Sequence, residues 1–243
     1  SMPDKLHIAA YNRNDSRALI YAMILAKMDI NLDQAMAIIE KNDSLDIKQK
    51  TDTYINEFTA LDDNIRLPLI EICLPVLNEL SYNKKVMFIK TCIELVSQDS
   101  KLAYFEFIIL VFIRSQLINN AKHKNKQNLD IKKATQPISR VLSTVVHFGK
   151  NNDPEKVFSH YMSRIVSTDT NSTLVPLSEC KVNLISDDLN ELSKLSPKHK
   201  KVLLKLLIDC IHHDFKILPE EADIIRIISL TVNCPIPPIT PTT

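Results

Sequence analysis

The sequence of 243 residues contains a single glycine, Gly149, and no tryptophan. Phosphate-binding loops and tight β-turns use glycine where the backbone needs a positive φ or must approach a ligand closely. The scarcity of glycine therefore argues against a glycine-dependent phosphate loop and against a turn-rich β fold. The net charge of +1 provides no overall field that would attract nucleic acid or a membrane surface, and we expect no nucleic-acid partner.

The signatures of common catalytic sites are also missing. The sequence has no HExxH motif of a zinc protease, no GxSxG nucleophile turn, no Walker loop and no Rossmann fingerprint. No CxxC pair occurs, and the scattered cysteines are predicted to be buried, reduced thiols; they are Cys73, Cys92, Cys180, Cys210 and Cys234. We therefore expect that this chain is itself not an enzyme, and we assign it no catalytic residue.

The sequence also lacks long apolar runs. No uncharged apolar stretch approaches the roughly 18–20 residues that a membrane-spanning helix requires. The most apolar stretch, 105–113, is interrupted by Glu106 and followed by Arg114. No signal peptide is visible, and Ser1 precedes Met2, a start that is compatible with a piece of a longer protein.

Hydrophobic residues make up 45% of the sequence, which is ample for the core of one large or two small domains. Together with the lack of glycine, their helical spacing predicts an all-α, multi-helix array. Helices are predicted at 15–28, 32–41, 44–58, 66–81, 131–148 and 154–165, after an irregular start. Pro75 lies inside one of them and predicts a kink or break between Glu71 and Pro75. Gly149 is predicted as a helix C′ residue.

An internal repeat is the most informative pattern in the sequence. Residues 77–113 align without a gap with residues 192–228, at a constant offset of 115 residues, and eleven aligned pairs are identical. Apolar residues at spacings of four and three predict that each copy is a helical hairpin, with Ser81 and Ser196 as N-cap candidates. Such self-similarity indicates a supersecondary unit that is used twice.

Each hairpin has an acidic connection of the form Asp-x-Lys-[Leu/Ile]-x-x-x-Glu. Its carboxylates are candidates for a metal site, namely Asp99, Glu106, Asp214 and Glu221. The pattern matches the second half of an EF-hand loop, but Leu95 and Cys210 stand where early oxygen ligands belong. Because calcium requires roughly six or more oxygen ligands, we favour structural turns and expect no metal and no cofactor in this chain.

The densest histidine cluster is His212-His213-Asp214. Adjacent residues of a helix point about 100° apart, so the two imidazoles are poorly placed to hold one metal ion. A solvated helix end is the favoured interpretation of this cluster.

Several segments resemble one known family. Arg66 to Ser81, reading RLPLIEICLPVLNELS, resembles a signature in the C-terminal soluble region of bacterial HtpX-like membrane zinc metallopeptidases. Asp99 to Glu106, Leu230 to Ile239 and Asp15 to Met28 resemble other segments of the same region, in the same order. The repeated hairpin also resembles the TerB-like helical domain. The chain departs from the family at its turn glycine, which is Ser100 in the first copy.

The resemblance implies four segments: an N-terminal short-helix region at 1–65, a first TerB-like repeat at 66–120, a linker and helical connector at 121–185, and a second repeat with a proline-rich tail at 186–243. It implies a non-catalytic regulatory or substrate-handling domain, whose partners are client proteins and the catalytic and membrane domains of the same polypeptide. The zinc motif and the membrane spans of such proteins lie N-terminal to this region. The domain would be tethered to the bacterial inner membrane, on its cytoplasmic face.

Two other interpretations remain open. The chain is alternatively an independent TerB-like module that binds a metal ion or another ligand, or a stand-alone helical adaptor without a protease. The first of these depends on the four acidic-turn carboxylates, and the second on where the natural protein begins.

Overall fold

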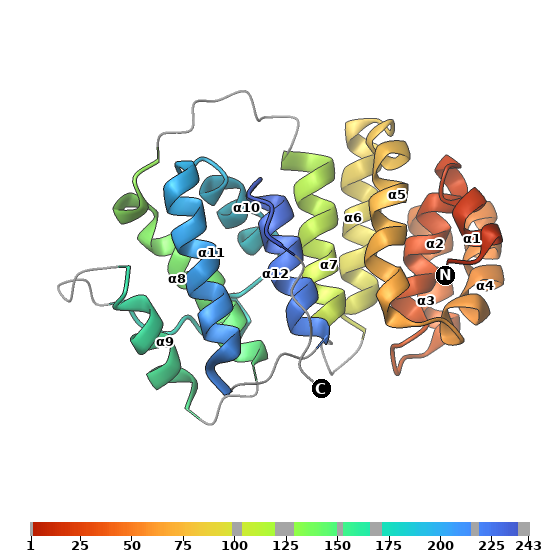
Figure 1. Ribbon diagram of the computed structural model, residues 1–243. Coiled ribbons are helices and arrows are strands. Elements are labelled where there is room, and N and C mark those ends of the chain that lie inside the picture. The colour runs from red at the N-terminus through yellow and green to blue at the C-terminus, as the bar shows by residue number, and fades with distance from the viewer. Residues whose placement is uncertain are drawn as a thin grey trace. The chain divides into compact units, whose positions relative to one another are not determined.

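Helices form nearly all of the regular structure of this protein. The computed structural model describes residues 2–98, 104–119, 129–149, 153–165, 172–214 and 219–237. Within these ranges there are twelve α-helices and a single isolated β-bridge, between Leu129 and Leu195 (Figure 1). The prediction of an all-α, multi-helix array is confirmed. In this part of the chain no helix is both long enough and apolar enough to cross a bilayer.

The chain divides into two compact units, Ser1–Ala121 and Lys122–Thr243. The four-segment division expected from the sequence is not tested by this result and stays a prediction.

The first unit is built around one helix. Its elements are α1 (Asp4–Ala9), α2 (Arg13–Leu25), α3 (Leu32–Asn42), α4 (Leu45–Thr59), η1 (Asp63–Ile65), α5 (Arg66–Asn78), α6 (Tyr82–Val96), α7 (Tyr104–Arg114) and the π-helical turn η2 (Ser115–Asn119). Every residue of α2 from Ala18 to Leu25 is buried. A helix that is apolar all round belongs in a core, and α2 packs against α4, α5 and α6.

The second unit has a similar centre. Its elements are η4 (Ile131–Ala134), α8 (Thr135–Phe148), α9 (Pro154–Met162), η5 (Leu177–Glu179), α10 (Val182–Leu192), α11 (Pro197–Ile211), η6 (His212–Asp214) and α12 (Pro219–Thr231). Most of α8 is buried between Pro137 and Val146, and this helix packs against α9, α10 and α11. Each unit therefore has its own central apolar helix.

The helix bounds follow the repeat in the sequence. α6 and α11 begin and end 115 residues apart, and α7 and α12 begin 115 residues apart. The residues before α6 and α11, Ser81 and Ser196, have nearly identical backbone angles, φ −60° with ψ 154° and φ −60° with ψ 153°. α5 and α10 also correspond within one residue at this offset. The acidic turns, including Asp99 and Leu102, lie outside the described residues, and superposition of the two hairpins stays a prediction.

Several local predictions are wrong. The expected irregular start contains α1, and the next helix is capped by Asn12, whose side chain accepts from the N–H groups of Asn14 and Asp15. α5 continues through Pro75 without the expected break, while the alternative, a kink, stays a prediction. Gly149 does follow α8, but its φ of −70° is not the left-handed conformation of a glycine C′ residue.

Candidate functional site

Glu106, one of the predicted metal candidates, is part of a buried ion pair. Its Oε1 lies 3.5 Å from Nη1 of Arg66, and both side chains are almost completely buried. The Arg66 guanidinium also lies over the ring of Phe105, 4.8 Å from its centroid. Glu106 therefore links α7 to α5 through a buried ion pair.

The other three candidates are only partly described. Glu221 is buried in α12, Asp99 lies outside the described residues, and for Asp214 the backbone alone is described. Across the described ranges no group of three or more histidine, cysteine, aspartate or glutamate side chains is arranged to hold a metal ion.

The histidine cluster at the end of α11 is partly engaged with α9. Nδ1 of His213 lies 3.2 Å from the hydroxyl of Tyr161, which donates to the carbonyl of Asp209 at 2.7 Å. The imidazole of His160 lies near that of His213, with ring centroids 6.4 Å apart and ring planes tilted by 47°. His212 and His213 are both exposed, as a solvated helix end requires.

All five cysteines are free and buried, as predicted. Burial raises the pKa of Cys73 and that of Cys210 to about 12, because an apolar environment disfavours the thiolate. The thiolate is the nucleophilic form of cysteine, so these residues are structural.

One exposed apolar surface of the first unit lies on α6. Tyr82, Val86 and Met87 are exposed by 65%, 42% and 42%, and they occupy one side of the first turns of this helix. We call these three residues the α6 surface. An aromatic side chain, a branched aliphatic one and a methionine on one exposed helix face form the kind of apolar patch that binds other proteins.

A polar pocket of about 370 Å³ adjoins this surface, and we call it the α6 pocket. It is lined by Arg17, Asn42, Asp43, Ser44, Asn83, Lys84, Met87 and Phe88. Met87 belongs to both features, so the apolar surface and the polar pocket are continuous.

The electrostatics of the α6 pocket depend on one buried ion pair. Nη1 of Arg17 donates to Oδ1 of Asp43, and the hydroxyl of Tyr21 donates to Oδ2 of the same carboxylate at 3.3 Å. Burial raises the pKa of Asp43, although Arg17 and Tyr21 act in the opposite direction. With Arg17 neutralised by Asp43, the ammonium group of Lys84 leaves the pocket with one excess positive charge.

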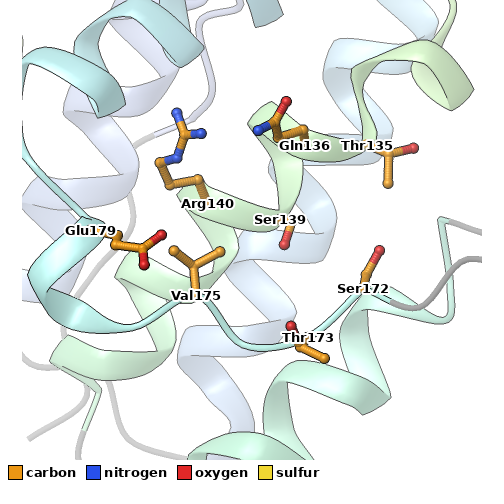
Figure 2. Close-up of a pocket in the computed structure, with 8 residues that line it drawn as sticks. All are labelled: Thr135, Gln136, Ser139, Arg140, Ser172, Thr173, Val175 and Glu179. Atoms are coloured by element: carbon orange, nitrogen blue, oxygen red, sulfur yellow. The ribbon is translucent and has the colours of Figure 1, made fainter.

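A second pocket lies in the other unit, and we call it the α8 pocket (Figure 2). Its lining residues come from the first turns of α8 and from the segment 172–179, and they are Thr135, Gln136, Ser139, Arg140, Ser172, Thr173, Val175 and Glu179. Nη1 of Arg140 donates to both carboxylate oxygens of Asp188 on α10, at 3.0 and 2.9 Å. Burial raises the pKa of Asp188 to about 7, against the opposing effect of Arg140.

The sequence analysis missed both pockets, but a signal for them exists. Arg17 and Arg140 each stand just before the apolar part of a helix, and each follows a buried serine, Ser16 or Ser139. A charged residue among apolar ones needs a partner or a route to solvent. The partners, Asp43 and Asp188, are distant in sequence and could not be identified from spacing.

Comparison with protein-family models, with curated proteins and with solved structures finds no match to this chain. The likeness to HtpX-like metallopeptidases and to TerB-like domains therefore rests on the sequence motifs alone.

Proposed function

We propose that this chain is a non-catalytic, polypeptide-binding domain that regulates, or presents substrates to, a membrane-bound zinc metallopeptidase. The motif order of the HtpX-like family supports the link to a protease. Its partners are the catalytic and membrane domains of the same polypeptide and client proteins. Zinc belongs to the catalytic domain, and the chain is tethered to the inner membrane of a bacterium at the cytoplasmic face.

The main support for a binding role is the exposed, apolar α6 surface. Exposed large apolar side chains on one helix face cost free energy in water, and this cost is recovered when a partner covers them. Tyrosine and methionine are both enriched at protein interfaces, and methionine adapts to partners of different shape. An unfolded client offers the apolar segments that such a surface binds.

The adjoining α6 pocket favours client segments that carry a negative charge. Lys84 gives the α6 pocket its excess positive charge, and Asn83 and Ser44 offer hydrogen bonds beside it. A client segment that combines apolar residues with a neighbouring carboxylate would contact both features at once. We therefore expect the bound segments to be apolar and locally acidic.

Binding is tested with a permanently unfolded polypeptide, reduced, alkylated and labelled with fluorescein, by fluorescence anisotropy. The double substitution Tyr82→Ser with Met87→Ser should weaken binding roughly tenfold, which is about 1.4 kcal/mol. The matched control is Val202→Ser, because Val202 lies 115 residues after Met87, is 43% exposed and has no comparable apolar neighbours. If the double variant and the wild type bind with equal affinity, the α6 surface is not the binding site for the polypeptide.

The link to a protease is tested separately. A peptidase assay of this chain with added zinc should show no turnover, and zinc-dependent turnover that co-purifies with the chain would refute a non-catalytic role. The reading frame upstream of the gene segment should encode membrane-spanning runs and an HExxH motif. Their absence from the natural protein would favour the stand-alone adaptor.

A further inference from the structure

The α8 pocket lies between a rigid helix and a segment that is tied to it at one end. The N–H of Val175 donates to Oγ of Ser143 at 2.9 Å, and its carbonyl lies 2.7 Å from Nε2 of His147. Both partners are on α8, so residue 175 is held against this helix. Ser172 and Thr173 lie across the pocket from Thr135 and Ser139, which are on the earlier turns of the helix (Figure 2).

One hydroxyl that lines this pocket, that of Ser139, makes no hydrogen bond to the described part of the protein. The residue is only 7% exposed, and its Oγ is open to the solvent of the pocket. Figure 2 shows its hydroxyl directed from α8 toward the space that Thr173 borders. A hydrogen bond from a ligand would replace the one that this hydroxyl makes to solvent in the pocket.

Two charged residues of opposite sign, Arg140 and Glu179, also line the pocket, and they are not paired with each other. Arg140 donates through Nη1 to Asp188, and in the described structure its Nε and Nη2 have no partner. Glu179 is exposed, and among the described residues it forms no ion pair, with Arg140 or with any other. Guanidinium N–H donors and a carboxylate thus line one pocket, and the remaining polar groups are hydroxyls and one amide.

We propose that the α8 pocket binds a small zwitterion with a polar side chain, either an amino acid or a short peptide with both termini free. The ligand carboxylate accepts hydrogen bonds from Arg140 and Ser139, and the ligand ammonium group pairs with Glu179. Gln136 and the hydroxyls of Thr135 and Thr173 hydrogen-bond the polar side chain. This site is separate from the α6 surface, so the two proposals succeed or fail independently.

Size and charge favour this class over others. The pocket volume of about 350 Å³ lies at the lower end of the range for small-molecule sites, which suits an amino acid or a dipeptide. A simple anion is disfavoured, because Glu179 and Asp188 place two carboxylates near Arg140. A sugar would lack a stacking partner, since no aromatic side chain lines the pocket.

The test is a calorimetric titration of the full chain with glutamine and with the dipeptide Ala-Gln, which distinguishes a free amino acid from a peptide. N-acetyl-glutamine and glutamine amide serve as singly charged controls. Binding of at least one zwitterion is expected, weakened about tenfold when either charge is blocked. Saturation without any dependence on the ligand charges, or no heat with either zwitterion, would overturn the proposal.

Two substitutions locate the site. Glu179→Gln should weaken binding about tenfold, and Ser139→Ala about fivefold, because each removes one bond to the ligand. Glu155→Gln, an exposed carboxylate in the first turn of α9, is the matched control and should bind as the wild type does. Glu179 is exposed, so its substitution leaves the fold intact, and unchanged affinity in Glu179→Gln would exclude the α8 pocket as the site.

Discussion

Asp188 combines two opposing influences on one carboxyl group. Its side chain is buried beneath α8, which favours the neutral acid, while the guanidinium of Arg140 contacts both of its oxygens and favours the carboxylate. The balance leaves its pKa near neutrality, at about 7, whereas an unfolded chain holds aspartate near 3.8. Proton binding by this residue is therefore coupled to folding.

The pH dependence of stability follows from that shift. Between pH 4 and 7 the folded chain holds a proton on Asp188 that the unfolded chain has released, so stability falls as the pH rises through this window and levels off above pH 7. The free energy of unfolding should fall by about 2 kcal/mol across this window. This is less than the full pKa shift of Asp188 implies, because the Arg140 charge and residual hydration reduce the effect. Thermal unfolding of the wild type and of Asp188→Asn across this range measures it. An equally steep slope in the variant would contradict the assignment.

Glu106 gives a second prediction, about packing. Because Arg66 and Glu106 are both buried, Glu106→Ala removes a carboxylate from beside a buried guanidinium and should destabilise the protein by about 3–5 kcal/mol. The double variant Arg66→Met with Glu106→Leu should recover much of this loss, since it removes both charges together. Urea unfolding measures both values. A small loss in Glu106→Ala, accompanied by lost affinity for a metal ion, would instead favour a ligand role.

Among the helices, the sequence predicted those with strong local signals. Asn31 and Asp153 cap their helices through side-chain oxygens, and Pro197 occupies the first turn of α11, as the residue types imply. α1 was missed because its six residues carry little periodicity. α5 continues through Pro75 because a packed helix tolerates a loss that would break an isolated one.

The C-terminal end of α12 has a capping structure that the sequence did not predict. Asn233 has a φ of 55°, and the N–H of Cys234 donates to the carbonyl of Ser229 at 2.9 Å. This is the Schellman arrangement, with asparagine in the place that glycine most often occupies. Pro235 follows and stops the helix. The proline-rich segment that resembles the HtpX-like family thus begins as a helix terminator.

The two repeat helices allow a direct comparison of their caps. Ser81 and Ser196 share the same backbone conformation, but only Ser196 accepts a hydrogen bond, from the N–H of His199 at 3.3 Å. We predict that Ser196→Ala costs about 1 kcal/mol and that Ser81→Ala costs clearly less. Chemical denaturation of the two single variants checks this. A larger loss in Ser81→Ala would show that the capping difference is not real.

In the molecule as a whole, the duplicated helices keep their buried positions and change their exposed ones. Phe88 and Leu203 are both buried at the shared offset, as are Ile89 and Leu204. Exposed positions diverge, since Tyr82, Val86 and Met87 of α6 correspond to Pro197, Lys201 and Val202 of α11. Periodicity therefore predicted the all-α fold class, while the repeat as a structural unit stays a prediction. The pockets could not be predicted, because they are formed by segments distant in sequence, such as 135–140 with 172–179.

The packing of the two central helices, α2 and α8, predicts which backbone amides exchange most slowly with solvent. Amides exchange with solvent slowly where opening requires the loss of most packing, and α2 and α8 each contact at least three other helices of their own unit. We predict that the slowest-exchanging amides of Ser1–Ala121 lie in α2 and that those of Lys122–Thr243 lie in α8. The short α1 and α9 should exchange faster, because each rests on fewer neighbours. Hydrogen–deuterium exchange with mass spectrometry measures this order, and α2 exchanging as fast as α1 would show that α2 is not the centre of its unit.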